Sequence, residues 1–206
     1  MKENKGIEIV YTVYNNIQNE TAYTGSITGY FDEESLKEIA EVMKQNGGHP
    51  VEMMDLPFFT EDWLWDECCE DFCEKMGEDF DPNWDEYSIE IDEKMPMELV
   101  KAAEDFIEHK DVQCNFYYMK DGVEMKGICE VALETKYFWK LVEAAKHPES
   151  GKNDFDLLKE RDPETWLWTG EWFIEDAFKS SMTKYGYDIK PYLKEFPNKV
   201  YEYLTY

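Results

Sequence analysis

The chain has 206 residues and a formal net charge of −26, because 47 Asp and Glu residues stand against only 21 Lys and Arg residues. This charge excludes a protein that binds nucleic acid directly through a basic surface. Hydrophobic residues make up 43% of the chain and aromatic residues 16%, which excludes a disordered acidic tail and predicts a folded protein with a sizeable core.

The chain begins with a pattern typical of two strands followed by a helix. Hydrophobic residues alternate along 7–14, and a second strand-like segment covers 21–31. We expect a helix next, with Asp32 as its N-cap and one apolar face at the i, i+3, i+4, i+7 spacing. The residues of that apolar face are Leu36, Ile39, Ala40 and Met43.

A second helix is predicted to begin after Thr60, which would be its N-cap, with Trp63-Leu64-Trp65 in its first turns. A helical wheel separates it into two sides. The apolar side contains Trp65, Cys68, Cys69, Phe72, Cys73 and Met76. The acidic side contains Trp63 together with Asp66, Glu67, Glu70, Asp71, Glu74 and Glu78. Five like-charge pairs at four-residue spacing in this helix cost about 1–2.5 kcal/mol together, so the acidic side opposes helix formation.

The acidic run continues beyond this helix through Asp79, Asp81, Asp85 and Glu86. Trp84 lies within the run, and we expect it to fold back over the start of the helix. The segment also resembles a calcium-binding loop, with Trp84 where such a loop needs glycine. The six candidate calcium ligands are Asp79, Asp81, Asn83, Asp85, Tyr87 and Glu90.

The second half of the chain repeats the pattern of the first at an offset of about 102 residues. Strands are predicted over 112–119 and 123–133, joined by a Lys120-Asp121-Gly122 turn, and a helix capped by Thr135 follows. The repeated features are the helix face of Phe138, Leu141, Val142 and Ala145, and the sequences His49-Pro50 and His147-Pro148, Trp63-Leu64-Trp65 and Trp166-Leu167-Trp168, Tyr87-Ser88-Ile89 and Tyr187-Asp188-Ile189, and Pro96 and Pro197.

These correspondences predict an α+β fold made of two tandem ββααα repeats, residues 1–109 and 110–206. An isolated two-stranded hairpin is marginally stable in water. We therefore expect the two antiparallel hairpins either to share one sheet or to pack separately against their own helices.

The acidity is concentrated in the first repeat. Residues 52–93 contain 17 acidic residues and one base, Lys75, whereas the matching segment 154–190 contains nine acidic and five basic residues. If the repeats share a fold, that fold does not require the acidity of the first. The excess charge therefore indicates a function, although a solvated acidic face that only maintains solubility is the alternative.

The sequence contains no pattern that is typical of an enzyme or of a cofactor-binding protein. It has no phosphate-binding loop, no HExxH and no GxSxG, and no apolar run approaches the ~20 residues of a membrane span. The N-terminus lacks a secretory pattern, so we expect a cytoplasmic protein with reduced cysteines. Its histidines are too scattered to form a convincing zinc site with the cysteines, which are Cys68, Cys69, Cys73, Cys114 and Cys129.

Strong acidity in a small chain is similar to the composition of nuclease inhibitors deployed by viruses and plasmids and of immunity proteins, a likeness that transfers no residues. The sequence therefore predicts an acidic inhibitor that masks a basic nucleic-acid-binding surface on another protein, such as a nuclease. A duplicated structural or ligand-binding module and a calcium-binding protein are the alternatives. The expected contact residues are Trp63, Asp66, Glu67, Glu70, Asp71, Glu74, Glu78, Asp79, Asp81, Asp85 and Glu86.

Overall fold

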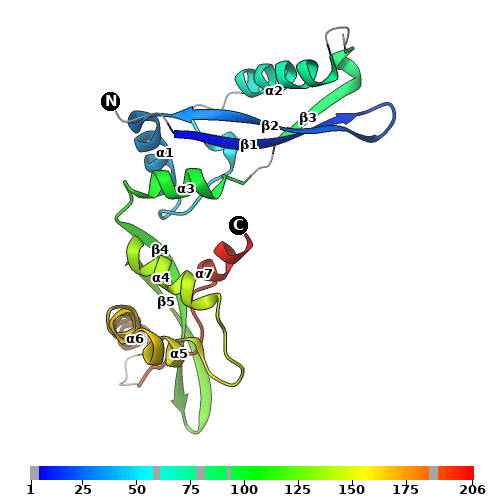
Figure 1. Cartoon of the computed structure of the whole chain (residues 1–206). Helices are drawn as coiled ribbons and strands as arrows, with labels where there is room; N and C mark the ends of the chain where they lie inside the picture. The colour runs from blue at the N-terminus through cyan, green and yellow to red at the C-terminus, as the bar shows by residue number, and fades with distance from the viewer. Residues whose placement is uncertain (1–4, 58–60, 78–81, 92–93, 186–189) are drawn as a thin grey trace. The chain divides into compact units, whose positions relative to one another are not determined.

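The computed structural model describes residues 5–57, 61–77, 82–91, 94–185 and 190–206. The fold is mixed α+β, which confirms the predicted class, and it divides into two compact units, Met1–Phe106 and Ile107–Tyr206 (Figure 1). The elements of the first unit are β1 (Lys5–Asn15), β2 (Glu20–Phe31), α1 (Glu33–Gln45), η1 (Met53–Asp55), α2 (Glu61–Met76), η2 (Trp84–Glu86), β3 (Tyr87–Ile91) and α3 (Met97–Glu104). Those of the second are β4 (His109–Lys120), β5 (Val123–Glu134), α4 (Thr135–Ala145), α5 (Asp154–Arg161), α6 (Pro163–Tyr185), α7 (Asn198–Glu202) and η3 (Tyr203–Thr205).

A three-stranded antiparallel sheet in the order β2-β1-β3 forms the centre of the first unit. The predicted alternation along β1 places every second side chain on one face of this sheet, where it is buried. α2 lies along β2 and covers one end of this face (Figure 1). The core cluster between α2 and the sheet contains Tyr11, Val13, Cys68 and Phe72, flanked by Tyr23, Ile27, Trp84, Tyr87, Ile89 and Ile91.

α1 begins where the sequence predicts. The backbone N–H of Ser35 donates to Asp32 Oδ1 at 2.8 Å, which confirms the N-cap. Ile39, Ala40 and Met43 from its predicted apolar face are buried. α1 contacts α3, the short helix that follows Pro96.

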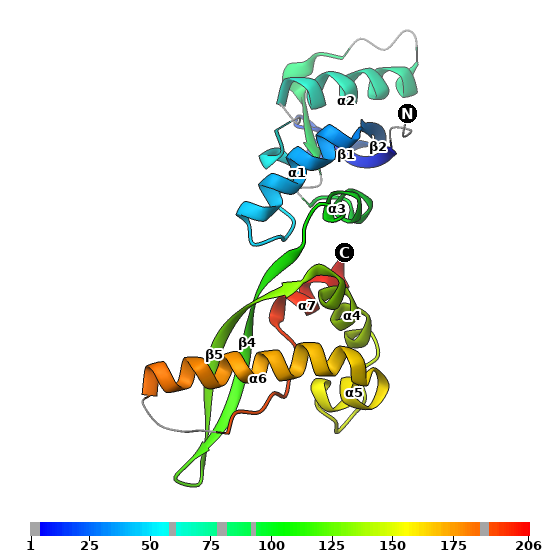
Figure 2. The same ribbon diagram turned by 90° about the vertical axis from the view of Figure 1, so that its left-hand side faces the viewer.

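The second unit is built on a hairpin in which β4 and β5 pair along their whole length. Asp121 and Gly122 form its two-residue turn with φ angles of 51° and 78°, which confirms the predicted hairpin because such a turn requires positive φ at both positions. α6 lies across the hairpin (Figure 2). The buried ring of Phe155 makes edge contacts with Phe173 from α6 and with Phe196 from the C-terminal segment.

Several finer expectations differ from the structure. The two hairpins belong to separate sheets, which is one of the two arrangements expected, but β3 joins the first hairpin as a third strand that the sequence did not predict. Thr135 does not cap α4, because its hydroxyl donates to the carbonyl of Ile107 at 2.7 Å. His49 is buried whereas His147 is exposed, so their shared proline does not reflect a shared environment.

Neither unit is a plain ββααα arrangement, because β3 stands between α2 and α3 and because α5 is an additional helix in the second unit. Among the described helices, none is long and apolar enough to cross a membrane.

Candidate functional site

α2 presents a row of carboxylates to solvent, which we call the α2 acidic face and define as Asp66, Glu67, Glu70 and Glu74. At 100° per residue these four side chains occupy an arc of about 100° on the helix. All four are exposed, and within the described part of the chain none of them has an ion pair or hydrogen bond. This surface therefore carries uncompensated negative charge.

The packing of α2 against the sheet determines which of its residues form the α2 acidic face. Cys68 and Phe72 are fully buried against the strands, and Cys69 is half-buried at the edge of the contact. Trp65 and Met76 were expected on the buried side but are exposed. The buried stripe is narrower than the predicted apolar side, because the sheet supports only the part of the helix that faces it directly.

Asp71 does not belong to the α2 acidic face, contrary to the sequence-based prediction. Its Oδ2 accepts a hydrogen bond from Tyr11 Oη at 2.6 Å and a longer one from Tyr23 Oη at 3.5 Å. Lys75 Nζ lies 4.0 Å from Asp71 Oδ1, and the Asp71 side chain is only 21% exposed. Burial and the hydrogen bond to this carboxylate both raise the pKa of Tyr11. Asp71 thus anchors α2 to the sheet.

η2 packs beside α2. The Trp84 ring makes an edge contact with Trp65, with ring centroids 5.7 Å apart, and also contacts Phe72, so Trp84 does fold back over α2. Asp85 in this turn is exposed. Glu86 is half-buried and accepts a hydrogen bond from Asn83, which indicates a local structural role instead of a free contact surface.

Four predicted contact residues cannot be placed on this surface. Trp63 lies in the first turn of α2, but its side chain lies outside the described part of the structure, and Glu78, Asp79 and Asp81 lie outside the described residues. The calcium-loop pattern disagrees with the fold, because Glu90 stands in strand β3 opposite Thr12 and not at the start of a helix. The described residues also contain no group of three or more acidic, His or Cys side chains arranged to hold a metal.

Several carboxylates of the second unit have cationic partners. Lys194 Nζ lies 2.7 Å from Glu124, Lys152 Nζ lies 2.6 Å from Glu160, and Arg161 contacts Glu149 at 3.3 Å. In α6, which the sequence pattern aligns with α2, Leu167 and Trp168 are exposed.

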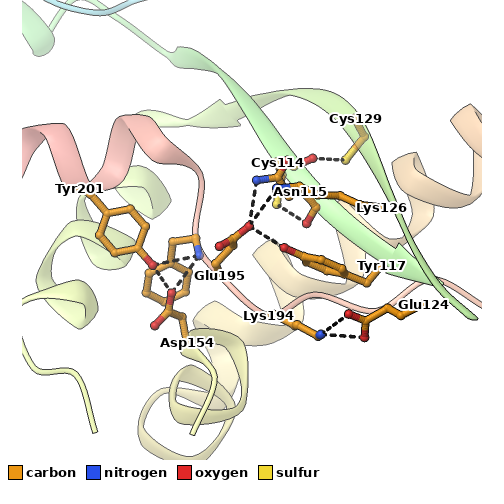
Figure 3. A network of polar contacts seen from close by, with 11 residues as sticks. Cys114, Asn115, Tyr117, Glu124, Lys126, Cys129, Asp154, Lys194, Glu195 and Tyr201 are labelled. Carbon is orange, nitrogen blue, oxygen red and sulfur yellow. Dashed lines mark hydrogen bonds and ion pairs between the residues drawn. The ribbon is translucent and has the colours of Figure 1, made fainter. Parts of the chain in front are cut away.

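A second polar cluster, which the sequence reasoning missed, fastens the C-terminal segment to β4 (Figure 3). Glu195 accepts hydrogen bonds from Asn115 at 2.9 Å and from Tyr117 Oη at 2.8 Å, and Lys126 Nζ lies 3.6 Å away. The hydrogen bond from Tyr117 lowers the pKa of Glu195, and the same bond raises the pKa of Tyr117 to about 12. The strand alternation does place Asn115 and Tyr117 on the face opposite the buried side chains, but no local pattern identifies Glu195 as their partner.

Asp154 extends this cluster toward α7. Its carboxylate accepts hydrogen bonds from the backbone N–H of Phe196 and from Tyr201 Oη. Every polar group in the cluster has a partner from this chain, so its chemistry is that of a structural clamp. The α2 acidic face, by contrast, can attract cationic groups from outside. No family model, curated protein or solved structure matches the chain.

Proposed function

We propose that this chain is an acidic inhibitor that binds and masks a basic nucleic-acid-binding surface on another protein, such as a nuclease. It would act in the cytoplasm as a nucleic-acid mimic of the anti-defence or immunity type, by binding and not by catalysis. The observation that carries the proposal is the α2 acidic face, with four exposed carboxylates and no cationic partner in the described structure.

The spacing of the carboxylates supports this choice of partner. Asp66, Glu70 and Glu74 follow one another at four-residue intervals, so each step rises about 6 Å along the helix axis, slightly more than one turn. Phosphates recur every ~3.4 Å of axis along one strand of duplex DNA. The two spacings differ, but Lys and Arg side chains are long and flexible, so those that reach phosphates along a strand can also reach these carboxylates. The long-range attraction accelerates encounter.

The repulsion within the α2 acidic face also supports the existence of a cationic partner, because the face destabilises the helix that carries it. Asp66 with Glu70 and Glu70 with Glu74 are like-charge pairs that together destabilise the helix by about 0.4–1 kcal/mol. Lys75 is the only base in the sequence between residues 52 and 93, and it lies 4.0 Å from Asp71, so it is not paired with a residue of this face. A cationic partner would relieve the repulsion on binding.

The proposal is tested by capturing partners from host extract at low salt with the chain as bait. The variant Asp66→Lys/Glu70→Lys/Glu74→Lys should capture no basic protein, whereas the wild-type chain should release its partner progressively as salt rises. Added wild-type chain should also displace an oligonucleotide from the captured protein in a gel-shift assay.

A matched control reverses three exposed carboxylates on the neighbouring helix α1, Glu34, Glu38 and Glu41. This variant has the same net charge as the α2 variant and should retain capture. Equal loss in both variants would assign capture to net charge alone, and full capture by the α2 variant would reject the surface. Circular dichroism must remain unchanged in both variants.

We also propose that the two units arose by internal duplication. Each begins with an antiparallel hairpin followed by a helix, and each ends with a short helix that begins after a proline, Pro96 or Pro197. β3 pairs with β1 in the first unit, and Tyr192 forms an antiparallel bridge with Tyr117 of β4 in the second. An experimental structure tests this proposal: hairpin, first helix and last helix should superimpose with the same connectivity, and opposite handedness would contradict it.

A further inference from the structure

Two buried cysteines face each other across the hairpin of the second unit. Cys114 of β4 and Cys129 of β5 are direct partners in a register that continues without a bulge from residue 109 to 134. Both side chains lie on the buried face, at 0% and 2% exposure. Cys129 Sγ lies 3.6 Å from the carbonyl oxygen of Cys114, so the sulfur already reaches the opposite strand (Figure 3).

The position of this pair in the ladder brings the two backbones within the Cα range of a disulfide. Tyr117 uses its backbone N–H and C=O to pair with Tyr192, on the side of β4 away from β5. By alternation, Cys114 and Cys129 form a hydrogen-bonded pair, whose Cα atoms lie about 5.5 Å apart in antiparallel sheets. Disulfides span Cα separations of roughly 4.4–6.8 Å and Cβ separations of roughly 3.5–4.5 Å. The Cα atoms of the pair are therefore within range, and bond formation must draw the Cβ atoms together by about 1 Å from their spacing of ~5.5 Å in such a pair. We propose that Cys114 and Cys129 are a redox pair that a low-molecular-weight disulfide, such as oxidised glutathione, converts into a cross-strand disulfide.

The reaction is a double thiol–disulfide exchange. One cysteine loses its proton, and its thiolate attacks a sulfur of oxidised glutathione, which forms a mixed disulfide and releases one glutathione thiolate. The other cysteine then loses its proton and attacks the protein sulfur of that mixed disulfide, which forms the Cys114–Cys129 bond and releases the second glutathione thiolate. The two released thiolates take up the two protons, so the cysteines are oxidised by two electrons and one oxidised glutathione is reduced.

Burial sets the rate of this reaction. Burial raises the pKa of the Cys114 thiol, with the neighbouring Cys129 adding to the shift, so little thiolate exists in the closed hairpin. Exchange therefore requires the hairpin to open, and urea below the unfolding transition should accelerate it. Once formed, the bond closes a loop between β4 and β5 and should raise the urea midpoint of the second unit.

The test incubates the whole protein with oxidised glutathione, with and without sub-denaturing urea, and maps disulfides by peptide mass spectrometry. We expect one intramolecular bond between Cys114 and Cys129, the loss of two hydrogen atoms without retained glutathione at either residue, and reversal by dithiothreitol. The same incubation in fully denaturing urea is the control for reagent activity, since all five cysteines are then exposed and should react.

Two results would overturn the proposal. In one, Cys114 and Cys129 stay reduced, or each retains its own glutathione, in sub-denaturing urea, while the cysteines of the denatured control react. In the other, they pair only with cysteines of another molecule. The variants Cys114→Ala and Cys129→Ala should each lose the internal bond and the shift in urea midpoint. Because mapping of the wild-type protein locates the bond directly, the test does not depend on whether either variant folds.

Discussion

Glu70 and Asp71 are neighbours in the chain but have different physical roles. Glu70 is exposed on the α2 acidic face, whereas Asp71 lies one step of 100° further round the helix and meets the hydroxyl of Tyr11. A carboxylate that accepts a hydrogen bond from a buried tyrosine of the sheet helps to hold its helix against the sheet. The same residue type therefore stabilises the fold at one position and opposes it at the next.

Replacing Tyr11 by Phe removes the short hydrogen bond to Asp71 and leaves the carboxylate facing an apolar ring. We expect the free energy of unfolding to fall by about 1–2 kcal/mol, because hydrogen bonds to charged groups are among the stronger ones. Urea denaturation measures the change. Tyr23→Phe is the control and should cost less, since its hydroxyl lies 3.5 Å from the same oxygen. An equal cost in both variants would show that Tyr11 Oη is not the main anchor.

The misassignment of Asp71 has a physical reason. A helical wheel finds the centre of the buried arc, and Cys68 and Phe72 were correctly placed there. The edges of the arc depend on what packs against the helix, and the partners of Asp71 come from strands that lie 60 and 48 residues earlier in the chain. Local periodicity contains no information about such partners, so positions at the edge were assigned wrongly in both directions.

At the scale of one element, α2 combines a good buried stripe with unfavourable surface charge. Glu70 has a like-charged neighbour one turn away on each side, Asp66 and Glu74. Glu70→Gln removes both repulsions and should raise the free energy of unfolding by about 0.4–1 kcal/mol at low salt. Urea titrations at low salt and at high salt measure the gain, which should shrink as salt screens the charges.

The control for this variant is Glu8→Gln, which removes one exposed charge from β1 without a helical neighbour. It should change stability much less than Glu70→Gln. A loss of stability on replacing Glu70 would mean that this carboxylate has a favourable contact in the folded protein and that the α2 acidic face is not under repulsion.

The C-terminal segment, residues 190–196, is held against the hairpin more by side-chain contacts than by backbone pairing. Within the described residues it pairs with β4 only through Tyr192, whereas β3 pairs with β1 over residues 87–91. The pKa of Glu195 is lowered by Tyr117, and that of Glu124 is lowered by Lys194. A depressed carboxyl pKa stabilises the fold fully above the unfolded value of ~4.3 and ceases to do so as pH falls through the lower folded value.

This linkage predicts an acid-sensitive second unit. Between about pH 5 and pH 3 the urea midpoint of the wild-type protein should fall more steeply than that of Glu195→Gln, which has no carboxylate to protonate at this position. At neutral pH the variant should be the less stable of the two. Parallel pH profiles would mean that Glu195 does not carry the acid dependence of the clamp.

The sequence predicted the elements better than their long-range pairings. Both hairpins and the helices that follow them appear close to the expected residues, because alternation, the Asp121-Gly122 turn and the Asp32 cap act locally. The addition of β3 to the first sheet and the bridge at Tyr192 join distant segments. These two pairings are stabilised by contacts between segments far apart in the sequence, so local patterns do not predict them.

At the scale of the whole molecule, the two units differ in how they manage negative charge. The first unit contains the uncompensated α2 acidic face, and the second pairs carboxylates such as Glu124 and Glu160 with lysines. Salt screens repulsion and attraction alike. Added salt should therefore stabilise the first unit around α2, where repulsion dominates. It should leave the second unit unchanged or slightly less stable, because ion pairs contribute there.

Hydrogen exchange measured by mass spectrometry can follow this difference in the intact chain. Raising KCl from about 20 mM to about 500 mM shortens the Debye length from roughly 20 Å to below 5 Å. We expect slower exchange of β1 and α2 amides, with unchanged or slightly faster exchange in β4 and α5. The Asp66→Lys/Glu70→Lys/Glu74→Lys variant is the control, because it should lose most of the salt protection of α2 while β4 behaves as in the wild type. Equal protection of all four elements by salt would contradict this assignment, because screening of the net charge of −26 as a whole would then suffice.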